Sequence, residues 1–158
     1  MWLRIVEART TGLQPPAFRI FVRQRSTRPL SVVLAFAPET SMKYSRYCRS
    51  LLSTPATAVD RYATSHRSGA DVAMVDLEDS VPPKRKEEAR RRAAAFFSAA
   101  SAASAARCAV RINSVSEADG LRDLLALREY PVKPAVVLIP KVESARDVEI
   151  VAHVLGPE

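Results

Sequence analysis

The sequence predicts an α/β protein built on a parallel sheet. From residue 47 onward, short apolar segments of strand length alternate with longer segments of helix-forming residues. Four such strand–helix pairs follow one another, which is the alternation of parallel strands joined by right-handed crossovers. One apolar segment, within residues 71–81 (DVAMVDLEDSV), passes directly into carboxylates, as strands of α/β enzymes do at their carboxyl ends.

Each predicted element has a local reason. Gly69 is suited to close the first helix, and the pairs Glu87/Arg91 and Glu88/Arg92 support the second at i,i+4 spacing. The Ala/Ser-rich end of that second helix is interpreted as frayed helix or loose linker. The predicted strands cover residues 50–54, 71–77, 107–112 and 135–139, and the predicted helices cover residues 57–68, 84–105, 117–129 and 143–155.

The charge of the chain is unevenly spread. The 158 residues are 47% apolar and 26% charged, which is typical of a globular domain with its own core, and carry a net charge of +7. Residues 1–45 hold seven Lys/Arg against two Glu and thus +5 of that charge. The remainder shows no basic stripe interleaved with aromatic residues, so we expect no nucleic-acid partner.

Cysteine and histidine usage argues against a metal-binding motif. Cys48 and Cys108 have no CxxC spacing, and we interpret them as small buried side chains in a reducing, cytoplasmic compartment. His66 and His153 are isolated, which favours core or surface roles over metal ligation. No apolar stretch approaches the roughly 20 residues that span a bilayer, so we expect no membrane association.

Residues 1–45 differ from the rest. Leu30–Ala37 resembles the apolar core of a signal peptide, but Pro38 would follow the cleavage site; a transit peptide fits the composition slightly better. We favour a basic extension without regular structure, or an upstream start with true translation from Met42. The predicted organisation is therefore an extension over residues 1–45 and a domain over residues 46–158.

Charged residues follow several of the predicted strands. Because the carboxyl ends of parallel strands open onto one face, the residues at these ends are expected to lie together: Pro55, Glu78, Asp79, Arg111, Asn113, Lys141 and Glu143. The planar Arg111 guanidinium suits a substrate carboxylate, Glu78 or Asp79 could orient it or hold a water of a divalent metal, and Lys141 could stabilise an enolate oxygen. Two simpler interpretations stay open: Glu78 and Asp79 cap the next helix, or the charges only neutralise each other.

Four motifs in this order, RSLL…P, VDLEDSVPP, VRIN and IPKVES, resemble the citrate lyase β-subunit-like group of the HpcH/HpaI aldolase superfamily. The resemblance covers residues 47–157. It implies a (β/α)8 TIM barrel, of which this sequence holds the first four βα units, and a Mg²⁺-dependent carbon–carbon lyase or aldolase. Such enzymes form or cleave a bond next to a carboxylate or acyl-CoA thioester through an enolate.

The resemblance also implies roles for single residues. The loop after the first strand departs from the family pattern, because Ala58 stands where relatives carry an Arg. The family's two Mg²⁺ ligands, a Glu and an Asp, follow its fifth and sixth strands; we therefore expect them beyond Glu158 and expect this chain alone not to bind Mg²⁺. The implied substrate-binding residues are Arg111 and Pro55, the implied catalytic residues are Lys141 and Glu143, and the implied orienting residues are Glu78 and Asp79.

Two functions follow as hypotheses. The first is the lyase, with a small carboxylate or acyl-CoA as substrate. The alternative is a truncated, inactive fragment that persists as a remnant or as a partner of an intact homologue. Because a half barrel leaves its first and fourth strands with open edges, we expect a homo-oligomer or pairing with a complementary half barrel.

Overall fold

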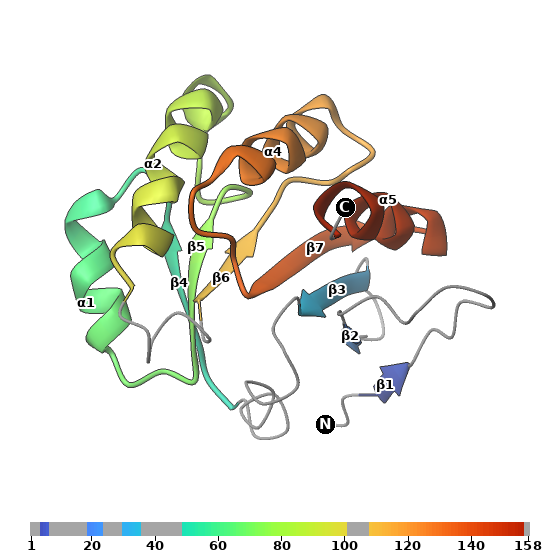
Figure 1. Cartoon of the computed structure of the whole chain (residues 1–158), viewed down its shortest axis with the longest axis horizontal. Coiled ribbons are helices and arrows are strands. Elements are labelled where there is room, and N and C mark those ends of the chain that lie inside the picture. Colours follow the sequence, from blue (N-terminus) through green and yellow to red (C-terminus); the bar gives the residue numbers. More distant parts are fainter. Residues whose placement is uncertain (1–3, 7–18, 24–29, 36–48, 101–107, 157–158) are drawn as a thin grey trace.

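A computed structural model of the chain describes residues 4–6, 19–23, 30–35, 49–100 and 108–156. The strands within these residues form one seven-stranded sheet in the order β1-β2-β3-β7-β6-β5-β4 (Figure 1). Four neighbouring strands are parallel, which confirms the predicted fold class. These are β4 (Leu51–Pro55), β5 (Val72–Asp76), β6 (Cys108–Arg111) and β7 (Val136–Val142).

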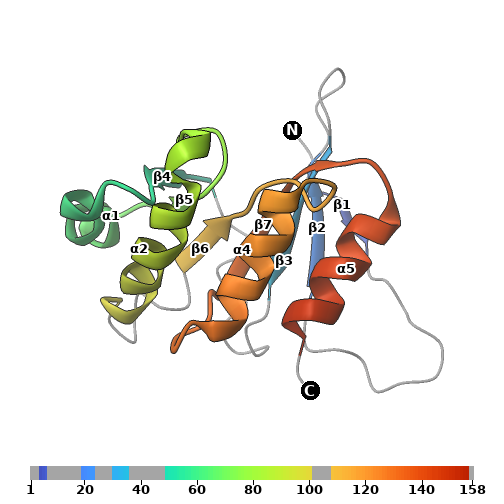
Figure 2. The same ribbon diagram turned by 90° about the horizontal axis from the view of Figure 1, so that it is seen from above.

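A helix follows each parallel strand, and the helices lie on one side of the sheet (Figure 2). Short 3-10 turns at Val59–Arg61 and Pro83–Arg85 lead into the first two. The second ends earlier than predicted, and residues 101–107 lie outside the described residues. The helices are α1 (Tyr62–Arg67), α2 (Lys86–Ser98), α4 (Ala118–Glu129) and α5 (Ala145–Leu155).

The core fills the space between the sheet and these helices. Alternate residues of β5 and its continuation, Ala73, Val75 and Leu77, point into it, because successive side chains of a strand face opposite ways. Asp76 therefore belongs to the other face of the sheet. The largest fully buried side chains are Phe96, Phe97, Leu77, Ile112, Leu124, Leu127 and Ile139.

Local signals in the sequence explain several helix ends. Gly69 has a φ of 73°, which suits the residue that follows a helix, as predicted. The ion pairs Glu87–Arg91 (3.3 Å) and Glu88–Arg92 (2.9 Å) on α2 are also as predicted. No helix among the described residues has both the length and the apolar character required to cross a lipid bilayer.

The front of the chain differs from the expectation of a segment without regular structure. Three strands lie within it: β1 (Arg4–Val6), β2 (Arg19–Arg23) and β3 (Leu30–Ala35). They form an antiparallel series, and β3 pairs antiparallel with β7. Residues 30–35 are rich in β-formers, and an edge strand such as β7 presents N–H and C=O groups that a further strand can satisfy.

This pairing corrects a second expectation. The edge of β7 is not open, because β3 covers it from the side opposite to β6. Among the described residues, β4 is paired on one side only, by β5. The predictions that concern Met42 and Cys48 fall outside the described residues. The boundary between residues 45 and 46 stays a prediction.

Candidate active site

The candidate site lies at the carboxyl ends of the parallel strands. The strand register aligns one residue from each strand in a single row: Pro55, Asp76, Arg111 and Leu138. Asp76 and Arg111 are therefore direct neighbours on adjacent strands and project from the same face of the sheet.

Arg111 is held by two hydrogen bonds to Asp76. Its Nε donates to Oδ1 over 2.8 Å and its Nη2 donates to Oδ2 over 2.6 Å, which is the bidentate geometry that fixes a guanidinium plane. Asp76 is fully buried and also accepts the backbone N–H groups of Glu78 and Ser80. Burial raises the pKa of Asp76, but these hydrogen bonds, led by that of Arg111, lower the pKa more, so it stays below the usual range.

Glu78 joins Arg111 to Lys141. Its Oε2 lies 3.0 Å from Arg111 Nη1, and its Oε1 lies 3.3 Å from Lys141 Nζ. Only 5% of the Glu78 side chain is exposed, and this burial raises the pKa of its carboxyl above the usual value despite the two cations. Asp79 is 70% exposed and approaches Arg111 Nη1 to 3.6 Å. We call Asp76, Glu78, Asp79, Arg111 and Lys141 the ionic cluster.

Lys141 has an unusual backbone. Its φ is 52°, in the left-handed region that side chains other than Gly rarely occupy. The register between β3 and β7 shifts here, because Leu30 pairs with Val142 while Val32 pairs with Ile139. A β-bulge changes the direction in which a side chain points. Here the Lys141 ammonium, on β7, reaches the carboxylate of Glu78, which follows β5. The ion pair with Glu78 raises the pKa of Lys141, so the side chain is protonated at neutral pH.

A glycine in α4 permits the close packing behind β6. A Cβ atom at Gly120 would lie 2.0 Å from the backbone oxygen of Ser114, which is a forbidden distance. Only glycine therefore lets the start of α4 approach the loop that follows β6. This loop also carries Asn113, which is buried just after the end of β6 and two residues from Arg111.

The structure brings together four of the predicted site residues: Glu78, Asp79, Arg111 and Lys141. Glu143 is different: its backbone N–H donates to Asp147 at the start of α5, its side chain is exposed, and no ion pair within the described residues links it to the cluster.

Pro55 is half-buried and lies next to Asp76 in the register row. Its carbonyl accepts the N–H of Ala58 in the loop after β4. The structure therefore places Pro55 at the edge of the site without giving it a polar side-chain contact.

Asp76 was not among the site residues predicted from the sequence. Glu78 and Asp79 were expected to orient Arg111, whereas its bidentate partner is Asp76. A signal was present, since a carboxylate inside a buried apolar strand requires a partner on a neighbouring strand.

The described residues do not fit a magnesium site. No group of three or more His, Cys, Asp or Glu side chains within them is arranged to hold a metal ion. Both oxygens of Asp76 accept hydrogen bonds, and both oxygens of Glu78 face cations. Hard cations take several oxygen ligands at once, which this arrangement does not offer.

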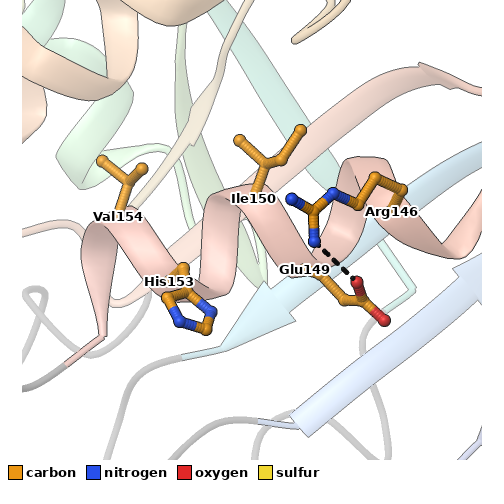
Figure 3. Close-up of a pocket in the computed structure, with 5 residues that line it drawn as sticks. All are labelled: Arg146, Glu149, Ile150, His153 and Val154. Atoms are coloured by element: carbon orange, nitrogen blue, oxygen red, sulfur yellow. Dashed lines mark hydrogen bonds and ion pairs between the residues drawn. The ribbon is translucent and has the colours of Figure 1, made fainter.

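A pocket of about 220 Å³ lies elsewhere, on α5 (Figure 3). Its polar groups do not converge on a common point, because Arg146 and Glu149 form an ion pair of 3.4 Å with each other. None of the ionic cluster belongs to it, so we assign it no role in the site. The residues that line it are Arg146, Glu149, Ile150, His153 and Val154.

Parallel strands followed by helices, with charged residues gathered at the carboxyl ends of the strands, define an α/β protein with a candidate site at one edge of its sheet. Residues 49–156 match the family HpcH/HpaI aldolase/citrate lyase. The chain belongs to this family, as its motifs predicted. The comparison with curated proteins gave no match.

Solved structures agree with the family. The chain is similar to RipC from Yersinia pestis, with 34% identity over 69% of this chain and 41% of that chain, and a TM-score of 0.50. It is similar to the citrate lyase beta subunit from Mycobacterium tuberculosis complexed with oxaloacetate and magnesium, with 36% identity over 65% and 42%, and a TM-score of 0.53. The CitE protein of the same organism with magnesium, acetoacetate and coenzyme A gives 34% over 68% and 38%, and a TM-score of 0.53. The chain thus spans about two fifths of the length of these relatives.

Proposed function

We propose that this chain provides the substrate-carboxylate end of a carbon–carbon lyase of the citrate lyase β type. Such an enzyme would cleave or form a bond next to a carboxylate or an acyl-CoA thioester through an enolate. The observation that carries the proposal is the ionic cluster, in which Asp76 fixes Arg111 beside Lys141 at the carboxyl edge of the sheet. Membership of the family supports it.

Arg111 is the proposed contact for the substrate carboxylate. A guanidinium carries five N–H groups, and Asp76 accepts two of them, from Nε and Nη2. N–H donors on Nη1 and Nη2 remain for a substrate anion. This anion would displace Asp79, which is the most exposed carboxylate of the cluster and the one farthest from the guanidinium. The side chain of Arg111 is 24% exposed, so a small ligand can reach it.

The charge of the cluster supports a need for a further cation. Three carboxylates face two cations, so a carboxylate substrate meets a net negative charge when all five groups are ionised. We propose Mg²⁺ as the cofactor of the complete site, held by residues other than those described. The magnesium in the related M. tuberculosis structures supports this assignment.

Lys141 is the proposed stabiliser of the developing enolate oxygen. Its side chain is 47% exposed at the edge of the sheet and its ammonium is paired with Glu78, so the group is both held and accessible. A positive charge that is already in place when negative charge develops lowers the barrier to the reaction. Glu143, two residues further on, is the second proposed catalytic residue, with a role in proton transfer.

Because the proposed Mg²⁺ ligands lie outside the described residues, the assay compares the full chain with and without Mg²⁺. Calorimetry measures oxaloacetate binding, and release of a 2-oxo acid from 3-carboxy-3-hydroxyacyl-CoA thioesters, in which C3 carries both the hydroxyl and the carboxylate, measures cleavage. Arg111→Lys keeps the charge but loses the planar fork, so oxaloacetate affinity should fall by roughly 1.5–3 kcal/mol. Arg146→Lys, on the exposed face of α5, is the matched control and should stay within about twofold of wild type.

Two results would oppose the proposal. Equal binding by Arg111→Lys and wild type would remove Arg111 from the site. A chain that binds neither oxaloacetate nor coenzyme A and cleaves no thioester would favour the alternative, an inactive relative that acts as an interaction partner of an intact homologue.

We propose a reducing, cytoplasmic compartment for the chain. We also propose that a second copy of the chain or a complementary half barrel pairs with the edge of β4.

A further inference from the structure

Lys86, in the first turn of α2, points its ammonium at the ends of β5 and β6. Its Nζ donates to the backbone oxygens of Leu77 (2.7 Å) and Glu78 (2.6 Å) and to Asn113 Oδ1 (2.6 Å). The residue is 9% exposed. An ammonium has three N–H donors, and each has a short, well-placed acceptor here.

The acceptors of Lys86 are all neutral. Taking an ammonium out of water costs free energy unless the charge is paired or fully hydrogen-bonded, and no salt bridge to Lys86 is found within the described residues. A neutral donor could satisfy a carbonyl at lower cost. The three hydrogen bonds of Lys86 offset the cost of burying the ammonium, and they hold it at one place between the ends of β5 and β6.

The two carbonyls lie where the regular strand pairing of β5 has ended. The last register pair of β5 with β6 is Asp76 with Arg111, so the oxygens of Leu77 and Glu78 need donors from outside the ladder. The Glu78 oxygen accepts the backbone N–H of Val81 (3.1 Å), and the Leu77 oxygen accepts Asn113 Nδ2 (3.0 Å). Lys86 adds a further donor to both oxygens at once. It thereby fixes the backbone of the one residue, Glu78, whose side chain joins Arg111 to Lys141.

A buried network behind Lys86 keeps it in place. Asn113 Nδ2 donates to the oxygen of Leu77 (3.0 Å) and to Asp123 Oδ2 (2.7 Å). Asp123 is fully buried on α4 and accepts Arg90 Nε from α2 over 2.8 Å. The ends of both strands are thus tied to two helices through side chains that are each nearly or fully buried.

We propose that Lys86 is a positioning residue for the Glu78 carboxylate and, through it, for the whole ionic cluster. The inference rests on the proposed function for its catalytic meaning, but the positioning itself can be measured without substrate or metal. Lys86 touches no reacting atom; it acts by setting where the Glu78 side chain leaves the backbone. From the sequence, Lys86 was predicted only as part of a helix.

The test compares Lys86→Met with Lys133→Met in the full chain. Lys133 also donates to two backbone oxygens, those of Leu127 and Arg128 at the end of α4, so its loss is chemically similar but remote from the site. The side-chain carboxyl of Glu78 is titrated by ¹³C NMR in each variant, with Glu78→Gln used to assign the signal. Isothermal calorimetry then measures oxaloacetate binding in the presence of Mg²⁺.

Burial is the largest cause of the raised pKa of Glu78, so a side chain that gains water in Lys86→Met should show a pKa nearer the ordinary glutamate value. Lys133→Met should titrate as wild type. Oxaloacetate affinity should fall by about tenfold or more in Lys86→Met and stay within about twofold in Lys133→Met. An unchanged Glu78 titration in a folded Lys86→Met chain would overturn the proposal.

Lys86→Gln, which retains two N–H donors, serves as a second variant and should give a smaller shift in the same direction. If both Lys86 variants fail to fold while Lys133→Met folds, Lys86 is required by the fold as a whole and the positioning role is wrong. If the Glu78 titration moves but the wild-type chain binds no oxaloacetate, the proposed function fails while the positioning role holds.

Discussion

The carboxylate of Asp76 and the guanidinium of Arg111 form a bidentate ion pair between the ends of β5 and β6. Their two hydrogen bonds measure 2.8 and 2.6 Å, and Asp76 has no exposed surface. Because Asp76 also accepts two backbone N–H groups, its own orientation is set by the loop that follows β5. The pair therefore gives Arg111 a single direction before any ligand arrives.

Asp76→Asn should destabilise the chain by roughly 2–4 kcal/mol, because it leaves a half-buried guanidinium without its bidentate partner. Urea unfolding measures the loss. Asp79→Asn is the matched control: the carboxylate is 70% exposed and 3.6 Å from Arg111, so its loss should cost less than about 1 kcal/mol. Equal effects of the two substitutions would show that Asp76 contributes no more than a surface charge does.

Glu78→Gln should change stability in a pH-dependent manner. The pKa of Glu78 is raised in the folded chain, so the folded state holds this proton more tightly than the unfolded state does. The stabilisation from the protonated form is complete below the ordinary glutamate pKa and is lost as the pH rises through the folded value.

Thermal unfolding of both proteins between pH 4 and pH 7 tests this sign. Wild type should lose stability relative to Glu78→Gln as the pH rises, because glutamine cannot ionise. A difference that stays constant over this range, or one that grows in favour of wild type, would mean that the pKa of Glu78 is not raised.

Two substitutions of Lys141 separate strain from function. Lys141→Gly and Lys141→Ala both remove the ammonium, but only glycine adopts a φ near 52° without cost. The glycine variant should therefore be the more stable by about 1 kcal/mol, as judged by urea unfolding. Both variants should lose the proposed activity. Higher stability of the alanine variant would argue against the left-handed backbone at the bulge.

Val33→Pro should reveal how far β3 supports the sheet. β3 lies between β2 and β7, so proline at an interior position removes a ladder hydrogen bond, and we expect a loss of about 1–3 kcal/mol in the free energy of unfolding. Val33→Thr keeps the backbone N–H and a β-branched residue of high strand propensity, so it is the control for loss of the ladder hydrogen bond and should cost less than Val33→Pro. If proline is tolerated equally well, β3 adds no stability to β7.

The parallel strands could be predicted because strands that are buried on both faces are near-continuous apolar runs. The strand ending at residue 139 was predicted too short, since Pro140 is a turn signal while β7 continues across the bulge to Val142. The strand β3 was missed for a different reason. Its composition is strand-like, but its partner β7 lies far along the chain, and such a distant pairing leaves no local pattern.

The site was predicted in part. The rule that parallel strands open onto one face was enough to place Glu78, Arg111 and Lys141 together. Asp76 and Lys86 were missed because their roles depend on strand register and on the packing of α2 against the strand ends. Neither the register nor this packing can be read from a pattern within one element.

The antiparallel contact between β3 and β7 has a consequence for synthesis on the ribosome. The units from β4 to β7 can associate one after another as they emerge, since each pairs with its predecessor. Val33, by contrast, pairs with Leu138, about a hundred residues later. The strand β3 thus emerges well before β7 and waits for its partner while the intervening residues are translated, and during that interval its unpaired edge is a natural target for chaperones.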